Sequence, residues 1–381
     1  MKGNMSMNPH PIEYSVSKAL YHTDKIKALQ QGQQITPTEI QVDLEAYCND
    51  NCSFCSYRKE DGYNNRMLEL INAKPGTAYH DDRPVGKPSP ESRIPLEFAD
   101  KFPEQMLEAG IPAIEITGGG EPTLWGRFND LVENLGKAGL EIGLVTNGSL
   151  LTDQRIKLLT KYCTWIRISM DSSNLETHKE IHRTANYDFD RRLNTIKKLA
   201  LSKSEELILG ISFIVTPDNY DDIENSARLF ASVGVNHIRF SWMYDREGHA
   251  GLTQEQIDGL KKLLDKLMDE LNRDDFRIIY EHGRIESYSK PNTDFNTCYY
   301  QRFVWAIGAD CKVYPCCIQK YHPDFAYGDI REKTLKQLVN DLKTISAMNN
   351  LDVTKCYPCW LRNRNKAIAK AVEKPMHVNF I

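Results

Sequence analysis

Apolar and polar residues alternate in six short runs, and amphipathic stretches separate most of these runs. The alternation predicts strands at 41–45, 113–117, 141–146, 165–170, 207–216 and 237–243. Apolar residues at helical spacing predict helices at about 96–109, 128–138, 153–163, 176–182, 190–202 and 221–233. Strands that alternate with helices favour a parallel sheet with crossover helices, which is an α/β fold.

The regions outside this alternating part have a different pattern. Residues 17–30 predict a helical piece near the N-terminus, and the polar stretch 56–93 predicts a long loop with little periodicity. A strong amphipathic helix at 253–272 leads into a C-terminal region rich in cysteines and turns. We therefore expect four parts: a lead-in at 1–34, an α/β domain at 35–250, a linking helix and connector at 251–294, and a small domain with a tail at 295–381.

Composition excludes several broad classes of protein. The chain has 381 residues, of which 41% are hydrophobic and 26% charged, and its net charge of −4 gives no field that favours nucleic acid or an anionic membrane. The polar N-terminus does not resemble a signal peptide, and no apolar run is long enough to cross a bilayer. We therefore expect a cytoplasmic protein without a membrane partner, whose thiols stay reduced and free to hold metal.

Three of the ten cysteines follow the first predicted strand closely, as Cys48, Cys52 and Cys55. Three thiolates at this spacing suit an iron–sulfur cluster, and they leave the fourth iron of a [4Fe-4S] cube open for chemistry. A zinc knuckle is the alternative, but such sites usually combine two pairs of ligands and no fourth ligand lies nearby. A disulfide is disfavoured by the odd local number of cysteines.

This cysteine motif, with Phe54 before its third cysteine, resembles that of the radical S-adenosylmethionine (SAM) superfamily. The resemblance implies that the open iron chelates SAM, and that an electron from the cluster cleaves SAM to a 5'-deoxyadenosyl radical. It also implies a partial (β/α)6 barrel of the TIM type, with the active site at the carboxyl ends of the strands. A reductant of the flavodoxin or ferredoxin type would supply the electron.

The residues at the ends of later strands match further parts of the family pattern. The sequence Gly-Gly-Gly-Glu-Pro at 118–122 resembles the motif that holds the SAM amino group, and polar residues ending the third and fourth strands would contact its ribose and carboxylate. Alternatively, Asn147 belongs to an ordinary turn, Asp171 caps a helix and Arg183 is a solvated arginine. The SAM contacts that the resemblance implies are Phe54, Gly119, Gly120, Glu121, Asn147, Ser169, Asp171 and Arg183.

A second group of cysteines lies in the C-terminal region, at Cys298, Cys316, Cys356 and Cys359. With a hairpin near 309–312 and a helix near 332–342, it resembles the Twitch domain, a short α+β relative of the SPASM domain. The arrangement is close to that of the aminocyclitol dehydrogenase branch. The resemblance implies one auxiliary [4Fe-4S] cluster, and no cysteine follows Cys359 to bind another.

Three cysteines do not fit either cluster. Cys311 occupies the hairpin turn, where SPASM-like sequences usually carry glycine. Cys317 directly follows Cys316, and because neighbouring residues of a strand face opposite ways, only one of the two is expected to bind the cluster. We choose Cys316, with Cys317 as the alternative. Cys163 ends a predicted helix and is most simply a small buried hydrophobe.

The sequence as a whole favours a radical SAM enzyme that takes a hydrogen atom from a substrate. The expected outcome is dehydrogenation of a small polar molecule, with the auxiliary cluster as electron acceptor. One alternative is radical modification of a peptide or a nucleotide, such as epimerisation, crosslinking or rearrangement. Another is a non-catalytic iron–sulfur protein that transfers electrons or senses redox state. No acid, base or radical-quenching residue can be singled out from the sequence.

Overall fold

The computed structural model describes residues 15–58, 66–73, 86–87, 89–184, 188–243, 251–280 and 294–373. Within these residues, ten strands form one sheet in the order β10-β9-β8-β1-β2-β3-β4-β5-β6-β7. Neighbouring strands from β8 through β1 to β7 are parallel, and β9 and β10 are antiparallel additions at the β8 edge. The predicted partial α/β barrel with a small C-terminal α+β part is confirmed.

The strands agree closely with the predicted runs, although β1 begins and ends two residues early because the chain leaves the sheet at Leu44. Their bounds are β1 (Glu39–Asp43), β2 (Ala113–Thr117), β3 (Glu141–Thr146), β4 (Trp165–Ser169), β5 (Ile208–Val215), β6 (His237–Trp242), β7 (Arg277–Tyr280), β8 (Val304–Ile307), β9 (Lys312–Tyr314) and β10 (Gly328–Asp329). β7 and β8 thus extend the sheet beyond the six predicted strands.

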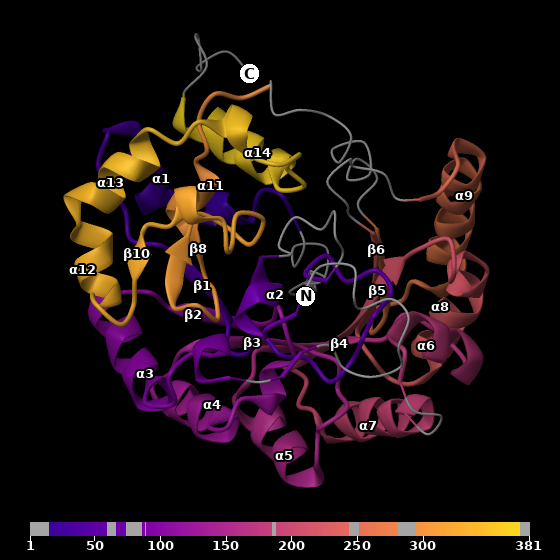
Figure 1. The fold of residues 1–381 in the computed structure, drawn as a ribbon. Helices are drawn as coiled ribbons and strands as arrows, with labels where there is room; N and C mark the ends of the chain where they lie inside the picture. The colour runs from indigo at the N-terminus through magenta and orange to yellow at the C-terminus, as the bar shows by residue number, and fades with distance from the viewer. Residues whose placement is uncertain are drawn as a thin grey trace, which may run out of the picture.

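The helices between the parallel strands lie in an arc on the outer side of the curved sheet (Figure 1). Local signals fix several of their ends: α3 ends at Gly110, which has a φ of 71°, and a capping box of Thr253 with Gln256 begins α9. The helices are α1 (Thr23–Gln30), α2 (Met67–Leu70), α3 (Phe98–Ala109), α4 (Phe128–Lys137), α5 (Asp153–Tyr162), α6 (Leu175–His182), α7 (Asp188–Ser202), α8 (Ile223–Ser232), α9 (Gln254–Leu271), α11 (Tyr300–Phe303), α12 (Leu335–Asn340), α13 (Leu342–Asn349) and α14 (Arg362–Val372).

The two faces of the sheet differ in chemistry. On β1, Ile40 and Val42 are fully buried in the main core beneath the outer helices. Glu39, Gln41 and Asp43 alternate with them and therefore face the inside of the curved sheet. This alternation gives the barrel a polar interior, and the carboxyl ends of the strands present polar side chains at its mouth.

The C-terminal region joins the same sheet. β8 pairs with β1 in parallel, so the first predicted strand lies between β2 and a strand some 260 residues later in the chain, with Glu39 opposite Val304. The connector predicted at 251–294 contains α9 and β7, and β7 pairs with β6. Much of the predicted 56–93 loop lies outside the described residues. Among the described helices, none combines the length and the apolar character needed to cross a membrane.

Candidate functional site

The cysteine motif lies in a loop, residues 44–58, which follows β1 and which we call the cysteine loop. Cys48, Cys52 and Cys55 are each half-buried. Burial raises the pKa of the Cys48 thiol well above its usual value, and nearby Asp50 and Cys52 add to the rise. Burial likewise raises the pKa of Cys55, and Cys52 again contributes. The three thiols therefore lie close enough to repel one another as thiolates, which a bound cation would offset.

A buried arginine holds the cysteine loop closed. The Arg58 guanidinium donates hydrogen bonds to the carbonyl oxygens of Asp50 at 2.5 Å and Cys48 at 3.1 Å, and to the Asn51 side chain at 3.3 Å. Arg58 is only 1% exposed. Burial would lower its pKa, but the cysteine thiols of the loop raise it. Arg58 therefore supplies a fixed positive charge beside the three sulfur atoms.

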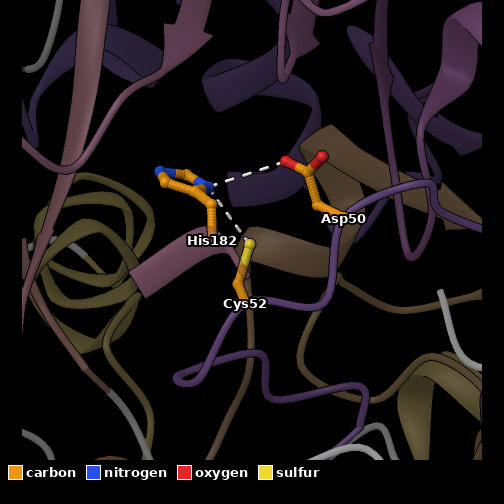
Figure 2. Close-up of side chains that lie close together, drawn as sticks. All are labelled: Asp50, Cys52 and His182. Carbon is orange, nitrogen blue, oxygen red and sulfur yellow. Dashed lines mark hydrogen bonds and ion pairs between the residues drawn. The ribbon is translucent and has the colours of Figure 1, made fainter. Parts of the chain in front are cut away.

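A second buried network fixes the loop from the side of α6 and α7, and Figure 2 shows its members Asp50, Cys52 and His182. Arg192 on α7 donates two hydrogen bonds to the Asp50 carboxylate, at 2.8 and 2.6 Å. His182 on α6 lies between Asp50 and Cys52, with Nδ1 at 3.6 Å from an Asp50 oxygen and 3.3 Å from the Cys52 sulfur. Burial would lower the pKa of His182, but Cys52, Asp171 and Asp50 raise it well above its usual value.

Asp50, Cys52 and His182 also offer donor atoms that lie within 4.8 Å of one another. An oxygen, a sulfur and a nitrogen would suit zinc as a mononuclear site. However, Arg192 occupies both oxygens of Asp50 and would place a guanidinium beside any ion there. We therefore interpret these residues as a hydrogen-bonded frame for the cysteine loop.

The glycine motif packs directly against the cysteine loop. The Gly120 N–H donates to the Glu45 carbonyl at 3.0 Å, and a Cβ at Gly120 would lie only 2.0 Å from the Tyr47 carbonyl oxygen. At Gly119 a Cβ would lie 1.9 Å from the sulfur of Met67. At Gly120 only glycine permits this approach to backbone, so the motif lies against the cysteine loop. That its backbone contacts SAM stays a prediction.

Glu121 joins the ends of β2 and β3. Its carboxylate accepts hydrogen bonds from the Thr123 N–H and hydroxyl, from the Thr146 hydroxyl at 2.6 Å, and from the Asn147 N–H at 2.8 Å. Asn147 in turn donates to Asn49 of the cysteine loop at 3.0 Å. Glu121 thus has four donors from its own chain, and it holds the Asn147 backbone in place.

The other residues predicted to contact SAM differ in their burial and in their neighbours. Asp171, after β4, is fully buried and lies 3.1 Å from Nε2 of His182. The Phe54 ring meets the His182 ring edge to face, with the centroids 6.4 Å apart. Arg183 ends α6 in the left-handed conformation with a φ of 52°, and Ser169 is the half-buried last residue of β4. The structure thus brings Phe54 and Asp171 together around His182.

The C-terminal cysteines line a small cavity of about 30 Å3. Burial raises the pKa of the Cys316 thiol well above its usual value, and neighbouring thiols raise it further. Burial also raises the pKa of Cys356 to about 12. Four half-buried cysteines around one small cavity suit the ligand set of a [4Fe-4S] cluster. The predicted ligands that line the cavity are Cys298, Cys316, Cys356 and Cys359.

The other three cysteines are not among the residues that line this cavity. Cys317 is adjacent in sequence to Cys316 and is not among the lining residues, although its charge influences the thiols of Cys316 and Cys359. The choice between the two stays a prediction. Cys311 is in the turn before β9 with a φ of 66°, a conformation that favours glycine. Cys163 is 7% exposed and belongs to the main core.

Three residues of this site escaped the sequence analysis, namely Asp50, His182 and Arg192. Asp50 lies within the cysteine motif, which was a usable signal. The spacing of His178 and His182 places both on one face of α6, and this too was visible in the sequence. For Arg192 the sequence contains no signal, because its partner Asp50 is 142 residues away.

Fold and site together define a class: a partial α/β barrel with two groups of cysteines that suit iron–sulfur clusters, one at the barrel mouth and one in a C-terminal extension. Residues 46–230 match the model of the radical SAM superfamily, and residues 298–360 match that of an iron–sulfur cluster-binding domain, SPASM. The chain is therefore a radical SAM superfamily protein with a C-terminal SPASM-type domain. These domains imply SAM and two [4Fe-4S] clusters as cofactors, and both sets of thiols fit them.

Curated relatives are distant and differ in what their names describe. The chain is 26% identical over 261 residues to a tungsten-containing aldehyde ferredoxin oxidoreductase cofactor-modifying protein of Pyrococcus furiosus, covering 64% of this chain and 69% of the relative. It is 28% identical over 212 residues to the radical SAM cyclopropyl synthase TigE of Paramaledivibacter caminithermalis, covering 54% of this chain but only 41% of that one.

Solved structures share the fold. SuiB of Streptococcus suis bound to the precursor peptide SuiA matches with a TM-score of 0.59 at 15% identity, covering 88% of this chain and 71% of SuiB. The anSMEcpe structure with bound AdoMet matches with a TM-score of 0.57 at 18% identity, covering 88% of this chain and 97% of that one. At these identities the likeness concerns the fold alone.

Proposed function

We propose that this protein cleaves SAM reductively, removes a hydrogen atom from a bound substrate, and oxidises a small polar molecule. Cys48, Cys52 and Cys55 would hold the SAM-binding cluster, and the backbone at Gly119 and Gly120 would face SAM. When bound, the SAM-binding cluster supplies the electron that cleaves SAM to a 5'-deoxyadenosyl radical, and the auxiliary cluster supplies a one-electron acceptor.

The chain's own residues keep this site rigid. Arg58 and Arg192 fix the cysteine loop from two sides, and both are about 1% exposed. Glu121 ties the ends of β2 and β3 together through the Thr146 hydroxyl, and Asn147 reaches the loop. Such a frame supports ordered binding of SAM and exclusion of water from a reactive radical.

The observation that carries the proposed oxidation is the cavity lined by four cysteine thiols in the C-terminal domain. Four protein ligands would leave no iron of the auxiliary cluster open, so substrate would not bind to it through iron. Its remaining roles are to accept an electron or to crosslink a small domain. A substrate radical must lose an electron to become an oxidised closed-shell product, which is why we favour oxidation over rearrangement.

A first experiment tests the cluster assignment. Anaerobically loaded wild-type protein should hold about eight irons, and replacing Cys48, Cys52 and Cys55 with alanine should leave about four. The triple variant should form no 5'-deoxyadenosine from SAM and dithionite, as measured by mass spectrometry. Cys317→Ala is the control and should retain all the iron. Continued SAM cleavage by the triple variant would refute the assignment. Wild-type protein that forms no 5'-deoxyadenosine would instead leave a non-catalytic electron carrier as the simpler function.

A second experiment tests the substrate class. Aminocyclitols, short peptides and nucleoside triphosphates would be added separately, and the rate of 5'-deoxyadenosine release measured. We expect stimulation by the aminocyclitols, with a product lighter by two hydrogens. Stimulation by peptides or nucleotides instead would favour the alternative of radical modification, which agrees with the names of relatives such as the subtilosin biosynthesis protein AlbA of Bacillus subtilis.

The role of the auxiliary cluster is tested by the Cys356→Ala/Cys359→Ala variant. If the cluster accepts the substrate electron, this variant should still cleave SAM but should release no oxidised product. Circular dichroism and the iron content of the SAM-binding site serve as controls for folding. If this variant formed the full amount of product, the auxiliary cluster would serve only as a structural crosslink. That result would argue for redox-neutral chemistry.

A further inference from the structure

His182 is the last residue of α6, and one of its ring nitrogens faces Asp50 and Cys52 of the cysteine loop. Its Nδ1 lies 3.3 Å from the Cys52 sulfur and 3.6 Å from an oxygen of Asp50. Its Nε2 lies 3.1 Å from an Asp171 oxygen, with the Asp171 backbone N–H at 3.4 Å. The ring is 1% exposed (Figure 2). Both nitrogens therefore have fixed neighbours and no access to solvent.

The direction of the hydrogen bond follows from the partners. A metal-binding thiolate has no hydrogen, so it can only accept. Arg192 already donates to both oxygens of Asp50, which leaves the Cys52 sulfur as the nearer acceptor for Nδ1. Asp171 at Nε2 fixes the orientation of the ring, in the way that carboxylates orient histidines beside metal sites.

We propose that His182 is a positioning residue whose Nδ1–H donates a hydrogen bond to the Cys52 sulfur and thereby raises the reduction potential of the cluster that Cys52 would help hold. This proposal rests on the proposed assignment of the SAM-binding cluster. A hydrogen bond draws negative charge from the sulfur, and it therefore stabilises the reduced cluster, which carries one more electron. The effect is strong because the contact is buried.

His178 provides a matched control within the same helix. It lies one turn earlier on α6, it is fully buried, and its ring centroid is 4.5 Å from that of His182. Its ring nitrogens lie 3.2 Å from the Ser172 hydroxyl and 3.2 Å from an Asp188 oxygen, and neither of these residues belongs to the cysteine loop. Replacing His178 thus disturbs the same packing without removing a contact to sulfur.

The test is a redox titration of the loaded full-length protein, followed by electron paramagnetic resonance. The SAM-binding cluster is recognised by the change of its signal when SAM is added. In His182→Leu the reduction potential of the SAM-binding cluster should fall by about 59 mV. For one electron, this corresponds to a roughly tenfold lower ratio of reduced to oxidised cluster at the same applied potential. The auxiliary cluster should keep its potential. His178→Leu should leave both potentials unchanged, and His182→Gln, which keeps an N–H donor, should shift the first one less.

A second measurement needs no destabilised variant. Wild-type protein labelled with 15N-histidine should show a weak nitrogen coupling to the reduced SAM-binding cluster in pulsed experiments. Absence of that coupling, a coupling strong enough for a direct iron ligand, or equal shifts in the His182 and His178 variants would overturn the proposal. A wild-type signal that does not respond to SAM would overturn the proposed function instead.

Discussion

At the scale of single residues, Cys311 shows how a side chain can be tolerated in a conformation that suits glycine. Its φ of 66° lies in the left-handed region, which costs a residue with a Cβ about 1 kcal/mol. Its side chain is 2% exposed and packs in the main core, and this burial offsets the strain. The charged groups that influence its thiol are Arg331, Asp329 and Asp310, so it lies among different neighbours from Cys316.

At this position a glycine variant should therefore be more stable than an alanine variant, which is the reverse of the usual order. Cys311→Gly should be more stable than Cys311→Ala by about 1 kcal/mol, because alanine keeps the backbone strain and loses the packing. Urea unfolding followed by circular dichroism measures the difference. Both variants should keep the full iron content. An alanine variant that is the more stable, or one that loses iron, would contradict the assignment of a purely structural role.

At the scale of strands, β1 and β2 place two carboxylates side by side on the inner face of the sheet. The Gln41 side chain donates to Glu39 and to Glu115, at 3.1 Å in each case. Burial and the nearby charge of Glu115 raise the pKa of Glu39 from 4.5 to about 7. In the folded protein Glu39 therefore stays protonated at pH values where the unfolded chain would already have released the proton.

This pair predicts a pH dependence of stability. Because the folded state binds more protons between pH 4.5 and about pH 7, the contribution of Glu39 to the free energy of unfolding should fall as pH rises through that range and level off above it. Glu39→Gln should remove this contribution. Urea unfolding from pH 5.5 to 8 measures it. Glu141→Gln, at the exposed start of β3, is the control and should leave the slope unchanged.

At the scale of the whole molecule, a buried ion pair connects the C-terminal region to the barrel. Lys320 lies 2.5 Å from Asp43 at the end of β1, and the Tyr321 hydroxyl donates to the same carboxylate at 2.7 Å. Lys320 is 1% exposed and Asp43 is fully buried. The Lys320 ammonium also lies 5.5 Å from the ring centre of Tyr57, two residues after Cys55. The segment after Cys316 thus braces the cysteine loop.

Removing one partner of this pair should be costly. Lys320→Met should destabilise the protein by about 3–5 kcal/mol, because it leaves a buried carboxylate without its cation. Asp43→Asn combined with Lys320→Met should recover most of the lost free energy of unfolding, because no buried charge is then left without a partner. Lys198→Met breaks an exposed pair with Asp153 and should cost at most about 1 kcal/mol. If unfolding experiments found Lys320→Met as mild as Lys198→Met, the bracing role would be wrong.

The sequence by itself determined the elements and the kind of chemistry. Period-two and helical patterns are local, so the six strands and the helices between them were predicted to within a few residues. The cysteine motif is equally local, since Cys48, Cys52 and Cys55 lie in one loop whatever the rest of the chain does. The turn at Cys311 was also predictable, because a short hairpin demands a left-handed residue.

Tertiary structure alone decided which distant residues share the site. His182 meets Cys52 across 130 residues, Arg192 meets Asp50 across 142, and Lys320 meets Asp43 across 277. No local pattern encodes such pairs, because they depend on strand order and on the faces that α6 and α7 turn inward. The same holds for the pairing of β8 with β1, which is fixed by packing between elements far apart in the chain.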